Sequence, residues 1–245
     1  MLGHLEIYIA IFAANFHLMN RILFVLLLTA MSFTAVAQIN ELGIIAGGAN
    51  YIGDVGPTNY IAPKDLAVGL MYRWNRSPRH SWRASFMYGK ITSDDADSEV
   101  SGRRQRGNKF ENTVKELSLG LEFNFFDFNL HEDGFKATPY IYSGLSYAFY
   151  DEKYMNNQQA RDYKNGSTLA IPMTVGIKAH VARHLVLGLE TGARYTFTDN
   201  LDGSNPGDGA YEGVRFGNLE SKDWYVFTGF TLTYTFTNKP CYCSQ

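Results

Sequence analysis

The residues best suited to chemistry in this sequence are its histidines. Four of them lie beyond residue 37, namely His80, His131, His180 and His184. A histidine held between a serine and a carboxylate can serve as the base of a hydrolase, and serines, aspartates and glutamates are abundant here. The chain has no G-x-S-x-G motif, which would present a nucleophilic serine on a sharp turn. Whether these histidines form an active site therefore depends on where the fold places them.

One loop-like segment holds side chains that could bind a cation. TDNLDGSNPGDG (residues 198–209) contains Asp199, Asp202, Asn205 and Asp208, and oxygen ligands on a flexible loop suit calcium. Their spacing does not fit the D-x-[DN]-x-[DN]-G pattern, and Asn, Asp, Gly and Pro are ordinary turn residues. We therefore predict a turn-rich loop with no metal or cofactor site, and calcium binding stays open as the alternative.

Two other stretches concentrate charge. Residues 93–109 (SDDADSEVSGRRQRGNK) place an acidic block before a basic one, which is typical of a solvated loop that pairs with itself, although it can also dock a charged partner. Residues 72–83 (YRWNRSPRHSWR) gather arginines and a histidine around one predicted turn. A basic turn suits contact with anionic headgroups or with a protein, so Arg76, Arg79 and His80 are candidate partner contacts.

The only two cysteines, Cys241 and Cys243, lie in the polar tail NKPCYCSQ (residues 238–245). They are too close in sequence to close a stabilising loop. Three alternatives stay open: a strained disulfide between the two cysteines, two free thiols, or a disulfide to another protein in an oxidising compartment. For the last of these, Cys241 is the favoured cysteine. The choice depends on the compartment that the tail occupies.

The N-terminal region carries an export signal. MNRILFVLLLTAMSFTAVAQ (residues 19–38) combines Arg21, an apolar run and an Ala-Val-Ala cleavage site before Gln38. The apolar run is short for a membrane-spanning helix. We interpret residues 1–18 as the result of a start codon assigned too early, so that Met19 is the true start, in preference to an anchoring helix. The predicted signal peptide is therefore 1–37, and the mature chain is exported.

The mature chain alternates apolar and polar residues in eight segments. In KELSLGLEFNFF (residues 115–126), leucines and phenylalanines occupy one face, whereas Ser118, Gly120, Glu122 and Asn124 occupy the other. This period of two is typical of β-strands, so the predicted fold class is all-β. The segments are residues 41–50, 65–74, 81–91, 113–126, 138–150, 170–181, 184–198 and 223–237.

The connections between these segments predict an outer-membrane barrel. The long ones are the first, third, fifth and seventh, at residues 51–64, 92–112, 151–169 and 199–222. Outer-membrane barrels have long extracellular loops and short periplasmic turns, and an even strand count leaves both termini periplasmic. We therefore predict an eight-stranded antiparallel transmembrane β-barrel over residues 38–237, integral to the outer membrane, with a periplasmic tail at 238–245. All four histidines then fall at the periplasmic end, which argues against an enzyme acting on the outer leaflet.

Aromatic and charged residues agree with this topology. The strands place two aromatic girdles at the membrane interfaces, with Trp74, Trp82, Phe123, Phe125, Tyr234 and Phe236 at the periplasmic rim and Tyr147, Phe149, Tyr195, Phe197 and Trp224 at the outer rim. The lumen-facing side carries charges that must pair with one another, namely Arg73, Arg83, Glu122, Lys178, Glu190 and Arg194. An eight-stranded barrel is just wide enough for side chains to fill, so we predict a plugged lumen and no diffusion pore.

Composition excludes little else. The chain has 22 basic and 24 acidic residues, a balance that gives no indication of a nucleic-acid partner. No motif for a small-molecule substrate is found, and none is predicted.

Several segments resemble the PorG-like outer-membrane barrels of Bacteroidota. They run through the whole mature chain and are NYIGD, YRWNRSPRHSWR, ELSLGLEFNFF, TPYIYSGL, RYTFTDNLDGSNP, DWYVFTGFTLTYTF and KPCYC. The resemblance implies a component of the type IX secretion system, which exports proteins bearing a dedicated C-terminal signal, gliding-motility factors among them. It further implies a tie between the outer membrane and a periplasmic ring of PorK-type lipoprotein and PorN-type protein. It brings no catalytic motif.

The expected function is therefore a non-enzymatic anchor. Its expected partners are outer-membrane lipid and the PorK/PorN-type ring proteins, the latter through a disulfide from Cys241 or Cys243. Two other classes stay open. A surface adhesin or ligand-binding barrel would act through the long loops, and a lipid-modifying enzyme would gather polar side chains at the outer rim.

Overall fold

The computed structural model describes residues 39–131 and 134–236. Both stretches belong to one compact unit. The predicted signal peptide (residues 1–37) and the tail that carries Cys241 and Cys243 lie outside the described residues.

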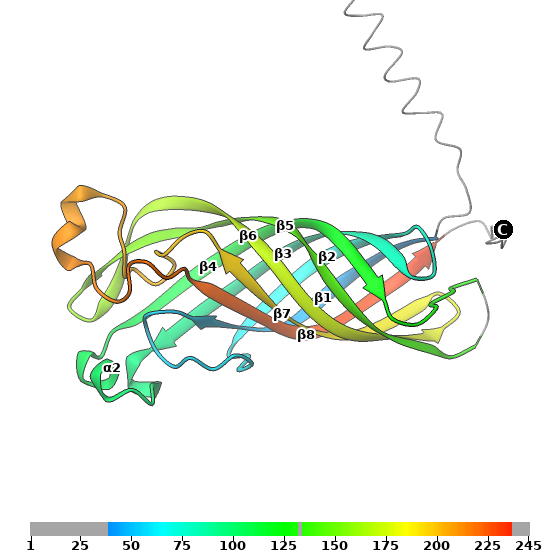
Figure 1. Cartoon of the computed structure of the whole chain (residues 1–245), viewed down its shortest axis with the longest axis horizontal. Coiled ribbons are helices and arrows are strands. Elements are labelled where there is room, and N and C mark those ends of the chain that lie inside the picture. Colours follow the sequence, from blue (N-terminus) through cyan, green and yellow to red (C-terminus); the bar gives the residue numbers. More distant parts are fainter. Residues whose placement is uncertain (1–38, 132–133, 237–245) are drawn as a thin grey trace, which may run out of the picture. The chain divides into compact units, whose positions relative to one another are not determined.

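Eight antiparallel strands form a closed barrel, which confirms the predicted fold class (Figure 1). The strands are β1 (Ile39–Ile52), β2 (Asp65–Asn75), β3 (His80–Asp94), β4 (Lys109–Asn124), β5 (Lys136–Asn156), β6 (Gln159–Ala182), β7 (Leu185–Thr196) and β8 (Trp224–Phe236). Each strand pairs with the next, and β8 pairs with β1 from Asn40–Phe236 to Ile52–Trp224. Closure leaves no free edge in the body of the sheet.

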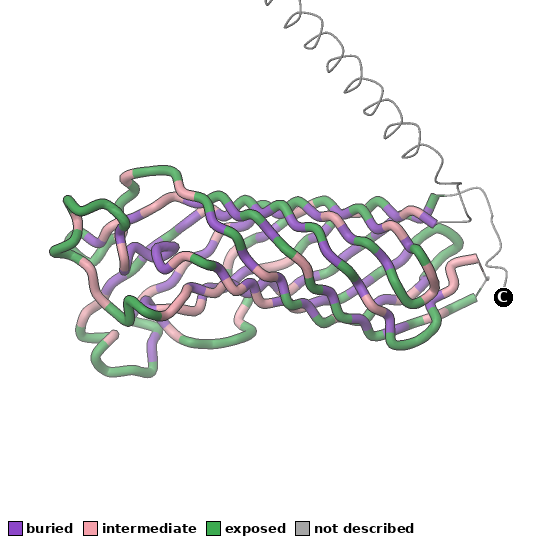
Figure 2. The backbone as a smooth tube through the Cα atoms, turned by 45° about the horizontal axis from the view of Figure 1, so that its top comes forward, coloured by how far each residue is buried: buried purple, intermediate pink, exposed green. Residues whose placement is uncertain are grey.

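Buried and exposed residues alternate along the strands (Figure 2). On β4, Leu117, Leu119 and Leu121 are exposed, whereas Ser118 and Glu122 are buried inside the barrel. The exposed apolar side chains of the other strands form a belt with those of β4, and they include Leu42, Ile44, Val68, Leu70, Phe86, Leu145, Val175, Ile177, Leu187, Leu189, Phe230 and Leu232. An apolar outer surface around a polar interior is the pattern of a barrel that contacts lipid.

The two ends of the barrel differ in their connections. The end that holds Ile39 and Phe236 is called the terminal end, and residues 76–79, 125–135 and 183–184 connect the strands there. The opposite, loop end carries residues 53–64, 95–108 and 197–223. The short helices η1 (Asp95–Asp97), α2 (Ser101–Arg106) and η2 (Gly209–Val214) all lie in these loops. None of the helices in the described part of the chain is long and apolar enough to cross a membrane.

The connection between β5 and β6 differs from the prediction. Residues 151–169 were expected to be a long loop, but both strands continue through them and join at a two-residue turn, Asn157 and Gln158. Both turn residues have positive φ, 50° and 64°, as primed hairpin turns require. The prediction was wrong because this hairpin projects beyond the apolar belt, where polar residues occupy both faces and the apolar alternation is lost.

Candidate functional site: the lumen plug and the two ends of the barrel

Glu122 lies at the centre of a charge network inside the barrel. Its carboxylate accepts a hydrogen bond from Lys178 Nζ at 2.6 Å, and Arg73 Nε lies 2.9 Å from its Oε1 atom. Arg83 Nη1 lies 3.7 Å from its Oε2 atom. All four side chains are buried. They come from β4, β6, β2 and β3 and converge because each occupies an inward-facing position of the period-two pattern.

Glu190 on β7 holds Arg83 in a bidentate pair. Arg83 Nη1 and Nη2 donate to the two carboxylate oxygens of Glu190, each at 2.7 Å. Tyr140 Oη donates to Glu190 Oε2 at 2.5 Å. A bidentate pair fixes the plane of the guanidinium as well as its position. Arg83 thereby links Glu190 to Glu122 across the lumen.

Two glutamates complete the network and were missed in the sequence. Glu41 accepts hydrogen bonds from Arg73 Nη1 at 2.7 Å and from Asn75 Nδ2 at 2.6 Å. Glu116 accepts one from Arg194 Nε at 3.3 Å and another from the Tyr225 hydroxyl. The signal that could have found Glu116 is its parity, because it shares the inward-facing face of β4 with Glu122.

The lumen is electrically balanced and filled. Its buried ionisable network pairs four cations with four anions: Arg73, Arg83, Lys178 and Arg194 against Glu41, Glu116, Glu122 and Glu190. Towards the loop end the filling becomes apolar, with Met87, Ile91, Val114 and Phe227 packed together. The cavity beside these four residues has a volume of about 20 Å³, which is room for about one water molecule and not for a continuous channel.

The basic segment 72–83 is divided between the lumen and the terminal end. Arg73 and Arg83 point into the barrel, so only Arg76, Arg79 and His80 lie at the exposed turn. Arg79 Nε lies 2.6 Å from Asp127 Oδ1 in the neighbouring connection, and the Arg76 guanidinium lies 5.8 Å from the centre of the Trp74 ring. The His80 ring packs against Phe123 with their centroids 5.2 Å apart. This turn therefore presents two exposed arginines beside an aromatic rim.

The histidines also lie at the terminal end. His80 begins β3, His131 lies in the 125–135 connection, His180 is near the end of β6, and His184 follows it in the turn. His180 Nδ1 is 3.3 Å from the Gly134 carbonyl oxygen, and the His184 ring packs on Tyr234. Within residues 39–131 and 134–236, no histidine lies at the loop end, where an outer-leaflet hydrolase would need its base.

Asp95 organises the charged segment 93–109 at the loop end. Its carboxylate accepts hydrogen bonds from Arg106 Nε at 2.7 Å, from Asn108 N at 2.9 Å and from Gly56 N at 2.8 Å. The first two bonds are within the segment, and the third ties it to the loop at residues 53–64. Arg106 also lies over the Phe216 ring, 4.6 Å from its centre. The segment pairs with itself and in addition joins the three loops into one cap.

The acidic residues of 198–209 make turn bonds instead of converging on one point. Asp202 Oδ1 accepts from Ser204 N at 2.8 Å, Asp199 Oδ2 from Asn205 Nδ2 at 3.1 Å, and Asp208 Oδ1 caps η2 through Ala210 N at 2.9 Å. Among the residues that the structure describes, no group of three or more His, Cys, Asp or Glu side chains is arranged to hold a metal ion.

Buried carboxyl groups nevertheless gather where this loop meets β1. The Tyr51 hydroxyl donates to Asp223 Oδ1, and Leu201 N donates to Asp223 Oδ2 at 2.8 Å. Burial and the nearby Asp202 carboxylate raise the pKa of Asp223 well above its usual range. Burial, with the Asp54 and Asp202 carboxylates, raises the pKa of Asp199 to about 6. These groups bind protons more readily in the closed cap than in water.

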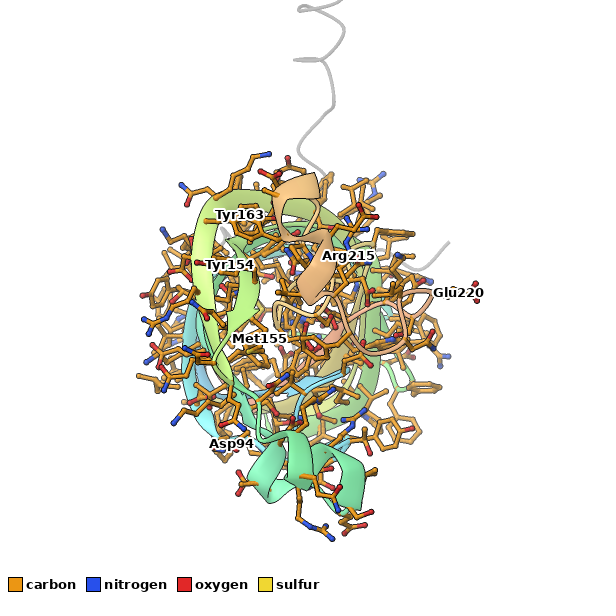
Figure 3. The ribbon with its side chains drawn as sticks, turned by 90° about the vertical axis from the view of Figure 1, so that its left-hand side faces the viewer. Asp94, Tyr154, Met155, Tyr163, Arg215 and Glu220 are labelled. Atoms are coloured by element: carbon orange, nitrogen blue, oxygen red, sulfur yellow. The ribbon has the colours of Figure 1, made fainter. Side chains whose placement is uncertain are left out.

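Tyrosines fix η2 on the β5–β6 hairpin. The ring of Tyr211 stacks on that of Tyr154 with centroids 4.1 Å apart, and it lies 5.1 Å from that of Tyr163. The Tyr163 hydroxyl donates to Glu152 Oε2 at 2.8 Å and accepts from Gly207 N at 3.0 Å. Figure 3 looks onto this end of the molecule, where Tyr154 and Tyr163 face the loop that carries Arg215.

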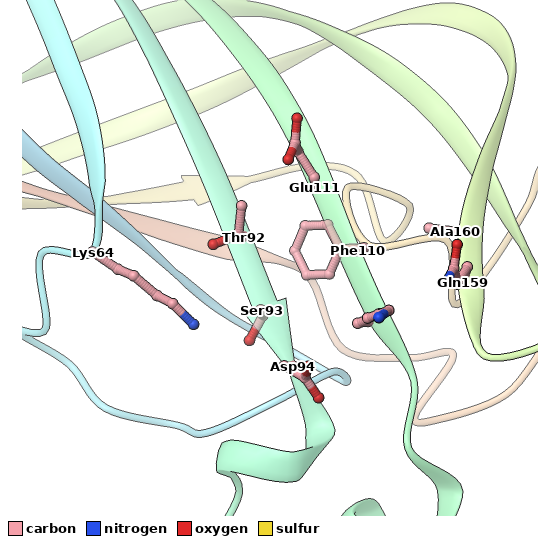
Figure 4. A pocket seen from close by; sticks show the side chains of 9 residues that line it. Lys64, Thr92, Ser93, Asp94, Phe110, Glu111, Gln159 and Ala160 are labelled. Carbon is pink, nitrogen blue, oxygen red and sulfur yellow. The ribbon is translucent and has the colours of Figure 1, made fainter.

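A pocket of about 460 Å³ lies on the flank of the cap (Figure 4). Lys64, Asp94, Lys109 and Glu111 line it together with hydroxyl and amide groups. Charges of both signs alternate around it, so it does not select a ligand by charge.

Most of the sequence matches a family model. A model described as "Domain of unknown function (DUF6089)" matches residues 20–245. The chain belongs to this family. The DUF6089 match includes the barrel, the residues of the lumen network and the tail with both cysteines, so these features are parts of one family unit. No curated protein matches this DUF6089 chain at a significant level.

Solved structures similar to this DUF6089 barrel include small outer-membrane proteins. A major outer membrane protein from Thermus thermophilus is 17% identical over 82% of this chain and 100% of that chain, with a TM-score of 0.46. The attachment invasion locus protein Ail of Yersinia pestis, bound to the heparin analogue sucrose octasulfate, is 11% identical over 82% and 100%, with a TM-score of 0.45. OprG of Pseudomonas aeruginosa is 11% identical over 83% and 97%, with a TM-score of 0.40. At these identities and TM-scores no function is transferred from them.

Proposed function

We propose that this DUF6089 protein is a non-enzymatic anchor embedded in the outer membrane. The observation that carries the proposal is the filled lumen inside an apolar outer surface. Moving a solute through this lumen would separate buried ion pairs such as Arg83–Glu190, and removing one partner of a buried pair typically costs about 3–5 kcal/mol. A barrel with a filled lumen, and with no histidine at its loop end among the residues that the structure describes, is suited to holding another component at the membrane.

The anchored component in this proposal is the periplasmic ring of the type IX secretion machinery, built from PorK- and PorN-type proteins. Support comes from the segments that resemble PorG-like barrels, which run from Asn50 to Cys243. In this placement both termini and the terminal end face the periplasm, and the loops face outward. Arg76, Arg79 and His80 are then exposed towards the ring.

The tail supplies a second contact in this proposal. The periplasm is oxidising, so Cys241 or Cys243 is available for a disulfide with a ring subunit. Non-reducing gels of membranes from wild-type cells are expected to show a reducible species of higher mass that disappears in Cys241→Ser. If wild-type membranes lack this species, the disulfide to a ring subunit is excluded. The anchor proposal would then be decided by the crosslinking experiment.

Capture from crosslinked cells tests the anchor role. The tagged protein is expected to recover the PorK- and PorN-type proteins, and a deletion strain is expected to lose secretion of type IX substrates and, where present, gliding. An unrelated tagged eight-stranded barrel serves as the control. Intact secretion in the deletion strain, with no ring protein recovered, would contradict the proposal.

A surface adhesin or ligand-binding barrel is the second candidate, because the loop end is organised by buried hydrogen bonds such as those to Asp95. Replacing residues 97–106 and 205–216 by short linkers separates the two candidates. Under the anchor proposal secretion persists, whereas an adhesin loses surface binding and is insensitive to changes at the terminal end. A lipid-modifying enzyme would instead lose activity through single substitutions at the outer rim.

A further inference from the structure

The loop at residues 53–64 has two parts: its first residues join the cap through Gly56, whereas residues 59–64 fold back along the outside of the barrel. Asn50, on the outer face of β1, holds it twice: its Nδ2 donates to the Asn59 carbonyl at 2.9 Å, and its Oδ1 accepts from Ala62 N at 3.2 Å. Lys64 N donates to the Ala49 carbonyl at 3.1 Å. Pro63 packs on Gly48 so closely that a Cβ there would lie 2.6 Å from Pro63 Cβ. Figure 1 shows this loop, blue to cyan, beside the strands.

The tip of this loop exposes apolar side chains. Tyr60 is 80% exposed and Ile61 is 61% exposed, and both lie between the two residues that Asn50 holds. Leu66, the second residue of β2, is 72% exposed and pairs with Gly48, where Pro63 packs. These side chains therefore continue the apolar belt from the wall of the barrel onto the loop.

The level of the tip along the barrel is set by the strand register. Asn50 pairs with Val226 of β8, and Ile52, two residues farther towards the loop end, pairs with Trp224. Trp224 packs edge-on against Tyr195 at 5.0 Å, and Tyr195 against Phe197 at 5.4 Å. This aromatic group is one side of the predicted outer girdle. Asn59 and Ala62, the residues on either side of Tyr60 and Ile61, are thus bonded to the barrel wall at Asn50, next to the girdle and on the side of the apolar belt.

We propose that Tyr60 and Ile61 insert into the interface of the outer leaflet and fix the depth of the loop end in the membrane. This inference rests on the outer-membrane placement of the proposed function. The occupant is lipid because the patch is continuous with the belt and begins at the aromatic girdle, where amphipathic rings meet headgroups. The neighbouring Lys64 pairs with Asp97 at 3.1 Å, so its charge is directed to the cap and away from the apolar tip.

The tip of the loop is preorganised for insertion. Pro57 and Pro63 restrict its backbone, and the bonds to Asn50 and Ala49 fix residues 59, 62 and 64 on either side of Tyr60 and Ile61. A loop already held in place loses little conformational freedom on insertion, so even two apolar side chains add to membrane affinity.

Site-specific fluorescence in vesicles tests the proposal. The full-length protein with Cys241→Ser and Cys243→Ser receives a single cysteine, Ile61→Cys, labelled with an environment-sensitive dye and reconstituted into phosphatidylcholine vesicles. Two other exposed apolar residues are matched controls. They are Leu119→Cys on the belt, 57% exposed, and Val214→Cys at the end of η2, 41% exposed. A gel shift between heated and unheated samples verifies that each barrel is folded.

The expected result is a blue shift in the emission of the dye at residue 61. Its emission should also be quenched by lipids that carry a nitroxide near the headgroup. Leu119→Cys should be quenched by nitroxides deep in the acyl chains, and Val214→Cys by neither. Quenching at residue 119 without quenching at residue 61 would overturn this inference and leave the membrane placement intact. No quenching at residue 119 would overturn the membrane placement itself. A blue shift at residue 61 that fades as protein is diluted in the vesicles would point to a second copy of the chain and also overturn the inference.

Discussion

At the scale of single residues, Glu122 is the buried carboxylate on which three cations of the lumen converge. It is fully buried and lies within 4 Å of three cationic side chains, Arg73, Arg83 and Lys178. Burial of these cations is tolerated because the carboxylate compensates them at short range, and this compensation disappears if its charge is removed.

Neutralising this carboxylate is expected to destabilise the barrel. Glu122→Gln leaves Arg73 and Lys178 without a full counter-charge, and the free energy of unfolding should fall by about 3–5 kcal/mol. Glu111→Gln is the matched control, because Glu111 lies on the same strand and pairs with Lys90 at 2.6 Å on the exposed surface. Little change is expected there, because an exposed ion pair is screened by solvent. Urea unfolding in vesicles measures both, and equal losses would contradict the central role of Glu122.

The lumen residues show how far the sequence determines such a network. Their parity in the period-two pattern is sufficient to place Arg73, Arg83, Lys178 and Arg194 inside. The pairings are not predictable, because Arg83 and Glu190 are 107 residues apart and meet only through the stagger that closes the barrel. Glu41 was missed because it is the first residue of the predicted segment 41–50, where the alternation has few residues to support it.

At the scale of elements, the β5–β6 hairpin and the three-loop cap are the parts that the sequence described least well. The strands in the apolar belt are recognised by hydrophobic alternation, which follows from an apolar outer surface on one side and a polar, filled lumen on the other. Beyond the belt both sides are aqueous or face other loops, so that constraint disappears. The hairpin is specified there by its turn and by contacts such as Tyr154–Tyr211.

The turn of this hairpin offers a test at the scale of one element. Asn157 has φ of 50°, a conformation that a β-branched residue resists at a cost of about 1–2 kcal/mol. Asn157→Val is therefore expected to increase protease cleavage within residues 151–168 and leave the barrel folded. Asn156→Val, one residue earlier at the end of β5, is the control and should change cleavage little. Equal cleavage in the two variants would show that the turn does not hold the hairpin.

The cap is expected to respond to pH. The pKa of Asp199 is about 6 in the closed cap and 3.8 without its surroundings, so the closed form binds the proton more tightly. The stability from this group is full below pH 3.8 and is lost as pH rises through about 6. Hydrogen exchange of residues 199–223, corrected for intrinsic rates, should show more frequent opening at pH 7 than at pH 4.

A pair of variants isolates this effect. Asp199→Asn should remove the part of the pH dependence between pH 4 and 6, because the amide does not titrate. Asp208→Asn, in the same loop but serving as the cap of η2, should retain it. A cap that opens more often as the pH falls would have the opposite sign and would exclude Asp199 as its cause.

At the scale of the whole molecule, the filled lumen predicts electrical silence. Planar lipid bilayers containing the purified protein should show no stepwise current, in contrast to a general porin reconstituted in parallel. The physical reason is that charge balance is reached among the side chains themselves, with four cations against four anions and no water-filled path needed to solvate them. Reproducible unitary currents from the wild type would contradict the plugged lumen and with it the basis of the anchor proposal.

The asymmetry of the two ends predicts where a partner binds. Arg76 and Arg79 are the exposed cations of the turn at the terminal end, and Arg79 is already paired with Asp127 over 2.6 Å. The double variant Arg76→Glu and Arg79→Glu reverses this charge at the surface, where no buried contact is lost, so the barrel should fold and insert normally. Capture of PorK- and PorN-type proteins from crosslinked cells should fall, and secretion with it. Lys109→Glu, an exposed cation at the loop end, is the matched control and should capture them like the wild type. If the double variant and the control capture the ring equally, the docking surface is not this turn, and the tail with Cys241 and Cys243 is left as the contact to be tested by its removal.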